Sequence, residues 1–116
     1  MATLQLSDAA VEKARSLIRS RQYVLEDSWG EANPGAEEEN RFLERHSWAE
    51  YAEWHLAQDP DAGEETKARY RYPYGDFRRV HRSGLLAAKP RAAQNDHADV
   101  ERAADELLTL LDETAS

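Results

Sequence analysis

Basic and aromatic side chains are concentrated in residues 69–82 of this chain. That stretch holds five arginines and four aromatic residues, although the whole chain of 116 residues carries a net charge of -8. Guanidinium groups can bind phosphate oxygens through paired hydrogen bonds, and exposed rings can stack on nucleobases. The segment therefore predicts a contact surface for an anionic ligand or a nucleic acid. Its candidate contact residues are Arg69, Arg71, Arg78, Arg79, Arg82, Tyr70, Tyr72 and Tyr74.

The aromatic residues of this segment also have a structural interpretation. A chain of this length forms a core of limited size, and its ten Trp, Tyr and Phe residues must supply much of that core. In this case the segment connects a strand to a capped helix, and its motif residues are buried. The candidate buried residues are Pro73, Gly75, Asp76, Phe77 and His81. The sequence leaves both interpretations open, and for the tyrosines we prefer burial.

No residue pattern in the chain indicates catalysis. His81 follows Asp76 by five residues and falls on an apolar stripe, where we expect a hydrogen-bonded core histidine rather than a catalytic base. Ser83 lacks the Gly-x-Ser-x-Gly context of a hydrolase nucleophile. The absence of cysteine excludes thiolate zinc sites, and the acids of residues 59–65 lack the calcium-loop pattern. We therefore expect a protein that is not an enzyme and that uses no metal and no cofactor.

Charge is distributed unevenly along the chain. Residues 66–95 hold eight bases and one acid, a net charge of +7, whereas residues 22–65 hold thirteen acids and two bases. If the two regions pack together, their charges form surface ion pairs that each contribute about 0–1 kcal/mol. If the basic region is open, it can meet an external polyanion while the acidic region limits non-specific binding. Both arrangements remain open at this stage.

The hydrophobic pattern predicts a mainly α fold with about four helices in one small domain, residues 1–116. The last helix has the clearest signal, because six apolar residues follow the i, i+3, i+4, i+7 spacing of a buried stripe. These residues are Val100, Ala103, Ala104, Leu107, Leu108 and Leu111. The expected helix starts are Ser7 as N-cap of a helix over residues 8–21, Asn33-Pro34 for the third helix, Asp76 as cap of the fourth, and Asp96 as cap of the last.

A short β-hairpin is expected between the third and fourth helices. Its arms are predicted near residues 54–58 and 67–72, with turn-forming residues from Asp59 to Gly63 between them. The third helix is expected to place Phe42, Leu43 and His46 toward the core.

The fourth helix is predicted to carry one apolar stripe and an interruption. Pro90 cannot donate a hydrogen bond to the carbonyl of Leu86, so a kink or a break is expected near residues 87–89. The stripe would consist of Phe77, Val80, His81, Gly84 and Ala88.

The amino-terminal sequence has no basic region followed by an apolar run, and no apolar run approaches the roughly 18 residues of a membrane span. We expect a cytoplasmic protein that does not insert into membranes.

Residues 50–112 resemble a family of small bacterial and phage-associated proteins whose activity is not established. The shared pattern is an aromatic-Pro-x-Gly-Asp-Phe unit, then Val-His-Arg, then Arg-Ala, and a late His-x-Asp. The matching residues are Tyr72, Pro73, Gly75, Asp76, Phe77, Val80, His81, Arg82, Arg91, Ala92, His97 and Asp99. Pro90 departs from the pattern, and residues before 50 do not match it. The resemblance implies no specific activity for this chain.

The sequence supports three hypotheses for function. The first is a protein-interaction or assembly module, in which Trp29, Trp48 or Trp54 and part of the last helix form an interface. The second is binding of a nucleic acid or a phosphate ligand by residues 69–82. The third is an acidic surface that mimics nucleic acid, formed by Glu37, Glu38, Glu39, Glu50, Glu53 and Asp59. The overall acidity favours the first hypothesis over the second.

Overall fold

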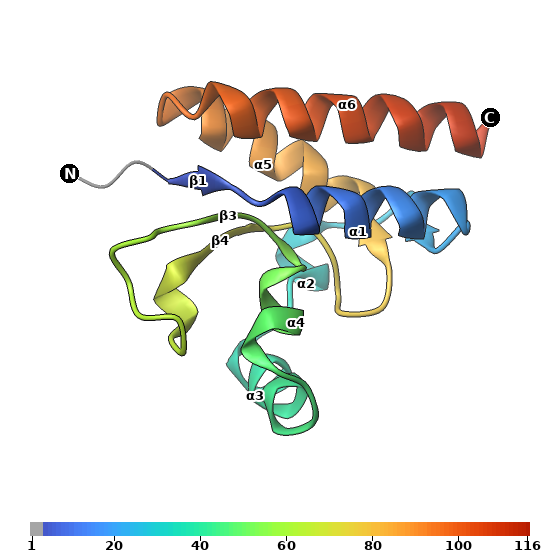
Figure 1. The fold of residues 1–116 in the computed structure, drawn as a ribbon. Helices are drawn as coiled ribbons and strands as arrows, with labels where there is room; N and C mark the ends of the chain where they lie inside the picture. Colours follow the sequence, from blue (N-terminus) through green and yellow to red (C-terminus); the bar gives the residue numbers. More distant parts are fainter. Residues whose placement is uncertain (1–3) are drawn as a thin grey trace.

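Six α-helices and two small sheets form residues 4–116, the part of the chain that this computed structural model describes (Figure 1). The prediction of a mainly α fold is confirmed, whereas the number of helices was underestimated. In chain order the elements are β1 (Gln5–Leu6), α1 (Asp8–Arg19), β2 (Tyr23–Val24), α2 (Trp29–Ala32), α3 (Ala36–Arg45), α4 (Trp48–Ala52), β3 (His55–Gln58), a 3-10 turn (Lys67–Arg69), β4 (Tyr70–Pro73), β5 (Val80–His81), α5 (Arg82–Gln94) and α6 (Ala98–Ala115).

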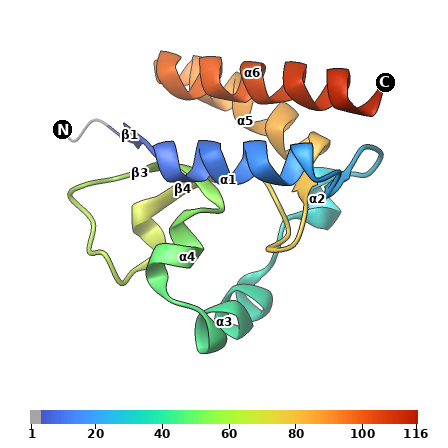
Figure 2. The same ribbon diagram turned by 45° about the vertical axis from the view of Figure 1, so that its right-hand side comes forward.

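Helices α1, α5 and α6 lie together on one side of the larger sheet, and α3 and α4 lie on the side away from α6 in both views (Figures 1 and 2). The larger sheet has the antiparallel order β1-β3-β4, while β2 and β5 form a parallel pair. No helix in residues 4–116 combines the length and the apolar composition needed to cross a bilayer.

The first and last helices form as their sequence patterns predict. Ser7 caps α1 by accepting a hydrogen bond from the Ala10 amide, and α1 ends at Arg19 rather than at residue 21. Arg21 has φ 60°, a left-handed conformation that terminates the helix. In α6, all six residues of the predicted apolar stripe are buried. Its start was predicted wrongly: Asp96 has φ 59° and precedes the cap position, which His97 occupies.

The predicted hairpin is confirmed. Strand β3 pairs antiparallel with β4, with Ala57 opposite Arg71 and Gln58 opposite Tyr70. The second arm begins later than predicted, because residues 67–69 form a single 3-10 turn before the strand.

The predicted start of the fourth helix is wrong. Helix α5 begins at Arg82, because Phe77 has φ 69° and no helix can run through that left-handed conformation. Asp76 caps a turn instead, and its side chain accepts hydrogen bonds from the Arg78 and Arg79 amides at 2.9 and 2.7 Å. The residues after this turn form strand β5, in which Val80 pairs with Tyr23 of β2.

Pro90 does not break α5, which continues to Gln94. The carbonyl that loses its partner belongs to Leu86, which is 45% exposed, and water can bond the freed oxygen on that side. Of the two predicted outcomes near residues 87–89, a kink or a break, the break does not occur.

The third helix also begins later than predicted. Asn33 ends the short helix α2, and α3 starts at Ala36 with Gly35 at its cap position. Phe42 and Leu43 are half-buried as expected, but His46 is exposed at the end of α3. Helix α3 contains no fully buried residue, so its position depends on contacts made by its half-buried face.

The core consists of two clusters of buried side chains. The larger cluster joins α1, α5 and α6 to the sheet through residues such as Ile18, Leu56 and Leu107. The smaller one contains Tyr51, Ala52 and Tyr70, against which half-buried side chains of α3, α4 and the 75–79 turn pack. The aromatic residues thus supply the structural support for the part of the molecule that lies away from α6.

Replacing Gly75 by alanine is expected to destabilise the fold. A Cβ at this position would lie 2.6 Å from the Arg79 carbonyl oxygen and 2.7 Å from a ring atom of Trp54. Because these neighbours are backbone and a buried ring, Gly75→Ala should lower the free energy of unfolding by about 1–3 kcal/mol in urea denaturation. Gly63→Ala is the control, since its Cβ would meet only the Thr66 side chain at 3.5 Å. Equal effects of the two changes would contradict the argument.

A second prediction concerns His55, which is 4% exposed in β3 and bonds the Tyr51 carbonyl through Nδ1 at 2.9 Å. Burial lowers the pKa of His55 to about 4 from its ordinary 6.5, although the hydrogen bond opposes this shift. The unfolded chain therefore takes up a proton first, so the stabilisation is complete above pH 6.5 and is lost as the pH falls toward 4.

The free energy of unfolding should fall by about 3 kcal/mol from this group over that range. His55→Gln retains a donor for the Tyr51 carbonyl and removes the titration. Urea denaturation at about pH 7.5 and about pH 4.5 should show a smaller pH effect in the variant than in the parent protein. Parallel loss of stability in both proteins would show that His55 does not govern this pH dependence.

Candidate functional site

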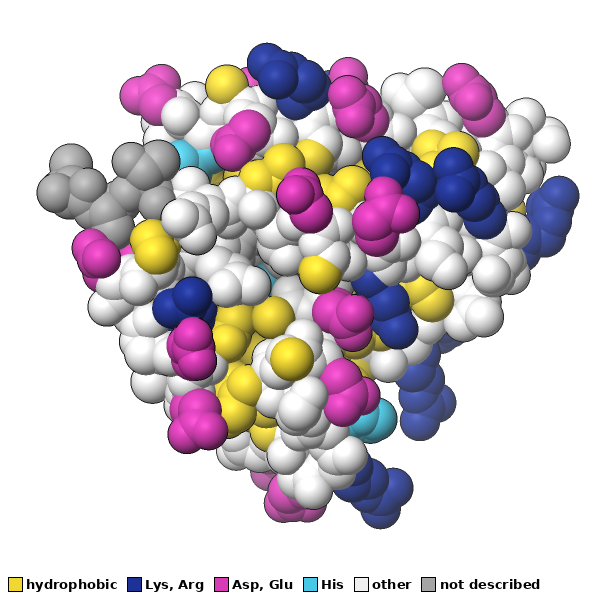
Figure 3. All heavy atoms as spheres, viewed as in Figure 1, with side chains coloured by type: hydrophobic (Ala, Val, Ile, Leu, Met, Phe, Trp, Pro, Cys, Tyr) yellow, Lys and Arg dark blue, Asp and Glu magenta, His cyan; other side chains and the backbone are white. Residues whose placement is uncertain are grey.

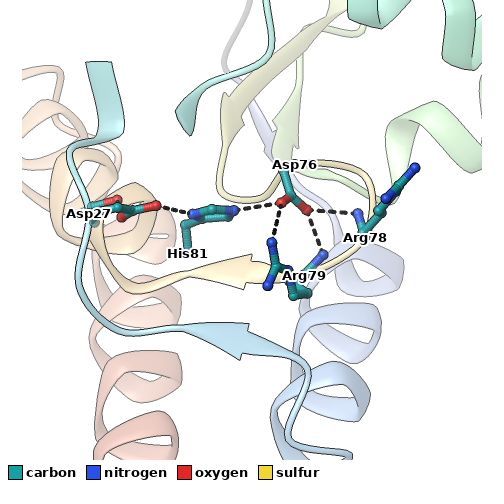
Figure 4. A network of polar contacts seen from close by, with 6 residues as sticks. Asp27, Asp76, Arg78, Arg79 and His81 are labelled. Carbon is teal, nitrogen blue, oxygen red and sulfur yellow. Dashed lines mark hydrogen bonds and ion pairs between the residues drawn. The ribbon is translucent and has the colours of Figure 1, made fainter. Parts of the chain in front are cut away.

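The turn that follows β4 is held by a network of charged side chains (Figure 4). Beyond its two backbone hydrogen bonds, Asp76 approaches the Arg79 guanidinium at 3.6 Å and the buried His81 ring at 2.8 Å from Nε2. The contact with Nε2 is close enough for an ion pair, although its geometry is not that of a hydrogen bond. His81 is buried and Asp76 is half-buried.

The other side of the His81 ring faces a carboxylate from a distant part of the chain. Nδ1 lies 2.5 Å from Asp27 Oδ2, in the loop after β2, and Ser83 donates a hydrogen bond to Asp27 Oδ1 at 2.6 Å. His81 thus lies between two carboxylates, with Asp27 at hydrogen-bond distance from Nδ1 and Asp76 close to Nε2. The ring thus joins the Asp27 loop, the Asp76 turn and the start of α5.

The same contacts set the ionisation of the two carboxyls. Burial favours the neutral form of Asp27, but hydrogen bonds from Ser83 and His81 outweigh burial and lower its pKa. Burial also opposes ionisation of Asp76, and contacts with His81 and with the amides of Arg79 and Arg78 lower its pKa in the same way. Both side chains are stabilised as carboxylates within the fold.

The network does not have the geometry of an acid-base site. The His81 side chain is only 6% exposed, and both its nitrogens face carboxylates, so neither is available to a substrate. Ser83 bonds Asp27 rather than the imidazole, which is the wrong order for nucleophile activation. Within residues 4–116, no cluster of three or more His, Asp or Glu side chains is placed to hold a metal ion. The contacts of His81 and Ser83 instead connect the Asp27 loop, the Asp76 turn and the start of α5.

Most arginines of the basic segment are used in internal contacts. Arg82 pairs with Asp112 through two hydrogen bonds, and Arg79 pairs with Asp76. Arg69 donates to the Gln58 side chain and to a loop carbonyl, and Arg71 donates to the Ala68 carbonyl. Arg78 is exposed, and among residues 4–116 it has no ion-pair partner within 4.0 Å. The arginines therefore do not form one open basic patch.

The tyrosines of the segment take different positions. Tyr70 and Tyr74 are buried, and their hydroxyls bond the Glu64 and Glu53 carbonyls, so neither ring can stack on a nucleobase. Tyr72 is half-buried with φ 62°, and its hydroxyl lies 2.7 Å from His97 Nδ1. Of the buried-motif candidates, Gly75 and His81 are buried, and Pro73, Asp76 and Phe77 are half-buried.

The turn and helix α3 together form one side of a cleft of about 670 Å³. The Phe77 ring stacks on the Phe42 ring at a centroid distance of 4.4 Å and an interplanar angle of 18°. The His46 ring also stacks on Phe42, at 4.2 Å and 17°. The left-handed conformation of Phe77 directs its ring to this stack. Trp54 also lines the cleft, and Lys13 lies 5.6 Å from its ring centroid.

Charged residues of both signs surround this aromatic stack. Glu50 bonds Ser47 and His46, and Asp76 is bonded within the network, so these two acids are already engaged. The other charged residues that line the cleft are not engaged in this way, because within residues 4–116 they form no ion pair closer than 3.9 Å. They are Lys13, Glu38, Arg41, Glu44, Arg45, Glu53 and Arg78.

Some contacts in this region could not be predicted from the sequence. Asp27 is the clearest case, because it lies 54 residues before His81 and no spacing rule connects the two. Phe42 was expected to face the core, and it packs against both core clusters, but its stacking on Phe77 could not be foreseen. The signal that pointed to the region was the Gly-Asp-Phe motif, which marks the turn but not its partners.

Replacing His81 by glutamine should leave the two carboxylates without their shared partner. We expect a loss of about 2 kcal/mol in the free energy of unfolding near neutral pH, measured with urea. Arg79→Gln is the control in the same network, since its exposed contact with Asp76 contributes at most about 1 kcal/mol.

The loss should also depend on pH. The lowered pKa values of Asp27 and Asp76 mean that their stabilisation is present above the ordinary value of 3.8 and disappears as the pH falls through the lower folded-state values. The difference between His81→Gln and the parent should therefore shrink in acid below that value. A difference that stays constant across the range would argue that the ring acts by packing alone.

No family model, no curated protein and no solved structure matches this chain. The resemblance of residues 50–112 to a family of small bacterial and phage-associated proteins stays a prediction.

Proposed function

We propose that the protein is a non-enzymatic module that binds another protein through the cleft between α1, α3, α4 and the 76–78 turn. The observation that carries the proposal is the Phe77–Phe42–His46 stack, which opens into a cleft of about 670 Å³. Aromatic side chains held in a rigid packing dominate the binding energy of many protein interfaces, because they bury large areas at a low entropic cost.

The charges around the stack favour a protein partner over a polyanion. Cationic and acidic groups alternate around the cleft, so a nucleic acid that approached the arginines would also meet Glu38, Glu44 and Glu53. Figure 3 shows the same mixture over one face of the molecule, where acidic, basic and apolar side chains are interspersed. A protein segment can match both signs, which gives specificity and a defined orientation.

The nucleic-acid alternative has less support from the geometry. Four of the five arginines in residues 69–82 are engaged internally, and two of the three tyrosines are buried. The acidic-mimic hypothesis also loses support, since Glu39 bonds Lys67 and the Tyr51 hydroxyl and Asp59 lies near Arg71.

The test reverses two exposed cations of the cleft, Arg45→Glu with Arg78→Glu. Neither residue has an ion-pair partner among residues 4–116, so the fold should be retained. Arg19→Glu with Arg91→Glu is the matched control, because these arginines are exposed in the last turns of α1 and α5 and lie outside the cleft. Proteins retained from an extract of the source cells are compared by quantitative mass spectrometry, and the purified partner is then titrated by calorimetry.

We expect the cleft variant to bind its partner at least about tenfold more weakly than the control variant, which should match the parent. Equal affinity of both variants would remove the cleft as the interface. Anisotropy titrations with single-stranded and duplex DNA at about 50 and about 200 mM salt test the alternative. Tight binding that weakens steeply with salt and is lost only in the cleft variant would replace a protein partner by a nucleic acid.

A further inference from the structure

A second concave surface lies between α4 and the loop that joins β3 to β4. It is a groove of about 600 Å³, separate from the Phe42 cleft. Figure 3 shows apolar side chains below the centre of the face, between the positions of α4 and this loop, with charged side chains along their margin. The residues that line the groove are Ser47, Trp48, Ala49, Ala52, Gln58, Glu64, Glu65, Arg69 and Tyr70.

Trp48 is the largest side chain of the groove, and its ring is fixed by two aromatic contacts. It stacks on Tyr70 at 6.1 Å with an interplanar angle of 18°, and it meets Tyr51 edge-on at 5.5 Å. Tyr70 is itself fixed, because its hydroxyl bonds the Glu64 carbonyl at 2.6 Å. Trp48 remains half-buried. A preorganised ring of this kind loses little entropy on binding.

The margin of the groove is acidic. Glu64 and Glu65 line it, and Asp61 lies in the same loop; none of the three forms an ion pair within residues 4–116. Arg69 is the base that lines the groove, and two of its donors are bonded to Gln58 and Ala62. The neighbouring bases Lys67 and Arg71 are directed to Glu39 and Asp59. The lining therefore holds two acids without an ion pair against one base whose donors are engaged, and Asp61 adds a further negative charge to the same loop.

We propose that this groove binds a basic, extended segment of a partner protein, with a lysine or arginine cation against the Trp48 ring and the carboxylates of Glu64 and Glu65. An indole face attracts cations through its quadrupole, and the attraction increases when the cation loses part of its hydration in a groove. The aliphatic part of the same side chain can cover Ala49 and Ala52, as long cationic side chains do on apolar surfaces. The charge of the loop selects this occupant over an acidic one.

The proposal is independent of the cleft between α3 and the 76–78 turn, and its test uses a peptide probe. A synthetic Lys-Pro-Leu-Lys-Pro-Leu peptide is titrated into the isotope-labelled protein, and the indole N–H resonance of Trp48 is followed by NMR. Trp48→Phe identifies that resonance by its loss. Two peptides of the same backbone, with glutamate or with glutamine in place of lysine, report the dependence on charge.

We expect the lysine peptide to shift the Trp48 resonance, and the glutamate peptide to leave it unchanged. Trp48→Ala should weaken binding by about tenfold. Glu64→Gln with Glu65→Gln should also weaken it and reduce its salt dependence, whereas Glu106→Gln with Glu113→Gln, which changes two exposed acids of α6, should match the parent. The double glutamine variant keeps the test decisive if Trp48→Ala does not fold.

Three results would overturn the proposal. Equal binding of the lysine and glutamine peptides would show an apolar groove with no selection for a cation. Unchanged affinity in the Glu64→Gln, Glu65→Gln variant would show that the acids take no part. A Trp48 resonance that moves on dilution of the free protein, and not with peptide, would assign the groove to a second copy of the chain. Arg45→Glu with Arg78→Glu should leave peptide binding intact, so failure here is distinguishable from failure of the proposed function.

Discussion

The contact of one buried imidazole with two carboxylates connects the Asp27 loop, the 75–79 turn and the start of α5. His81 brings together Asp27 and Asp76, which lie 54 and five residues away along the chain. Close packing beside His81 also requires glycine at position 84, because a Cβ on Gly84 would lie 2.8 Å from the Tyr74 carbonyl oxygen and 3.0 Å from a ring atom of Trp29. Buried charges cost desolvation free energy, and they are tolerated here because each partner is bonded on several sides.

The position of helix α3 follows from this network. The turn held by Asp76 allows Phe77 to adopt φ 69°, and the Phe77 ring then stacks on Phe42. Helix α3 has no fully buried residue of its own, so these half-buried aromatic contacts determine where it lies. Backbone strain at Phe77 is thus compensated by hydrogen bonds on one side and by ring stacking on the other. A strained turn of this kind is consistent with a positioning role, because it places an aromatic ring in the wall of a cleft.

The sequence predicted the elements whose signals are local. The apolar stripe of α6, the Ser7 cap of α1 and the β3–β4 hairpin each depend on residues close together in the chain, and all three are present. The start of α5 could not be predicted in this way, because an aspartate before a Phe-Arg-Arg sequence can cap either a helix or a turn. The choice depends on β5 pairing with β2, more than fifty residues earlier, and on the ring of His81.

The basic and aromatic composition singled out residues 69–82, but not the contacts that these residues make. Ion pairs such as Arg82–Asp112 join residues 30 positions apart, so composition alone could not show which charges of this segment are paired. The two oppositely charged regions meet only in part: Lys67 and Arg71 approach Glu39 and Asp59, whereas Arg82 and Lys89 pair with acids of α6. Among the charges without an ion pair in residues 4–116, one group lies around Phe42 and another along the 61–65 loop.

The smaller aromatic cluster explains how a chain with a limited core can present two concave surfaces. Tyr51 contacts Trp48 and Tyr70 on the side of the groove, and Phe42 and Phe77 on the side of the cleft. Its hydroxyl bonds Glu39 of α3, which ties α4 to α3 across the same cluster. Each surface thus has a wall of packed rings rather than flexible side chains, and ordering that wall on binding costs little entropy. The aromatic residues that sequence composition assigns to the core therefore serve both as core and as the walls of the two surfaces.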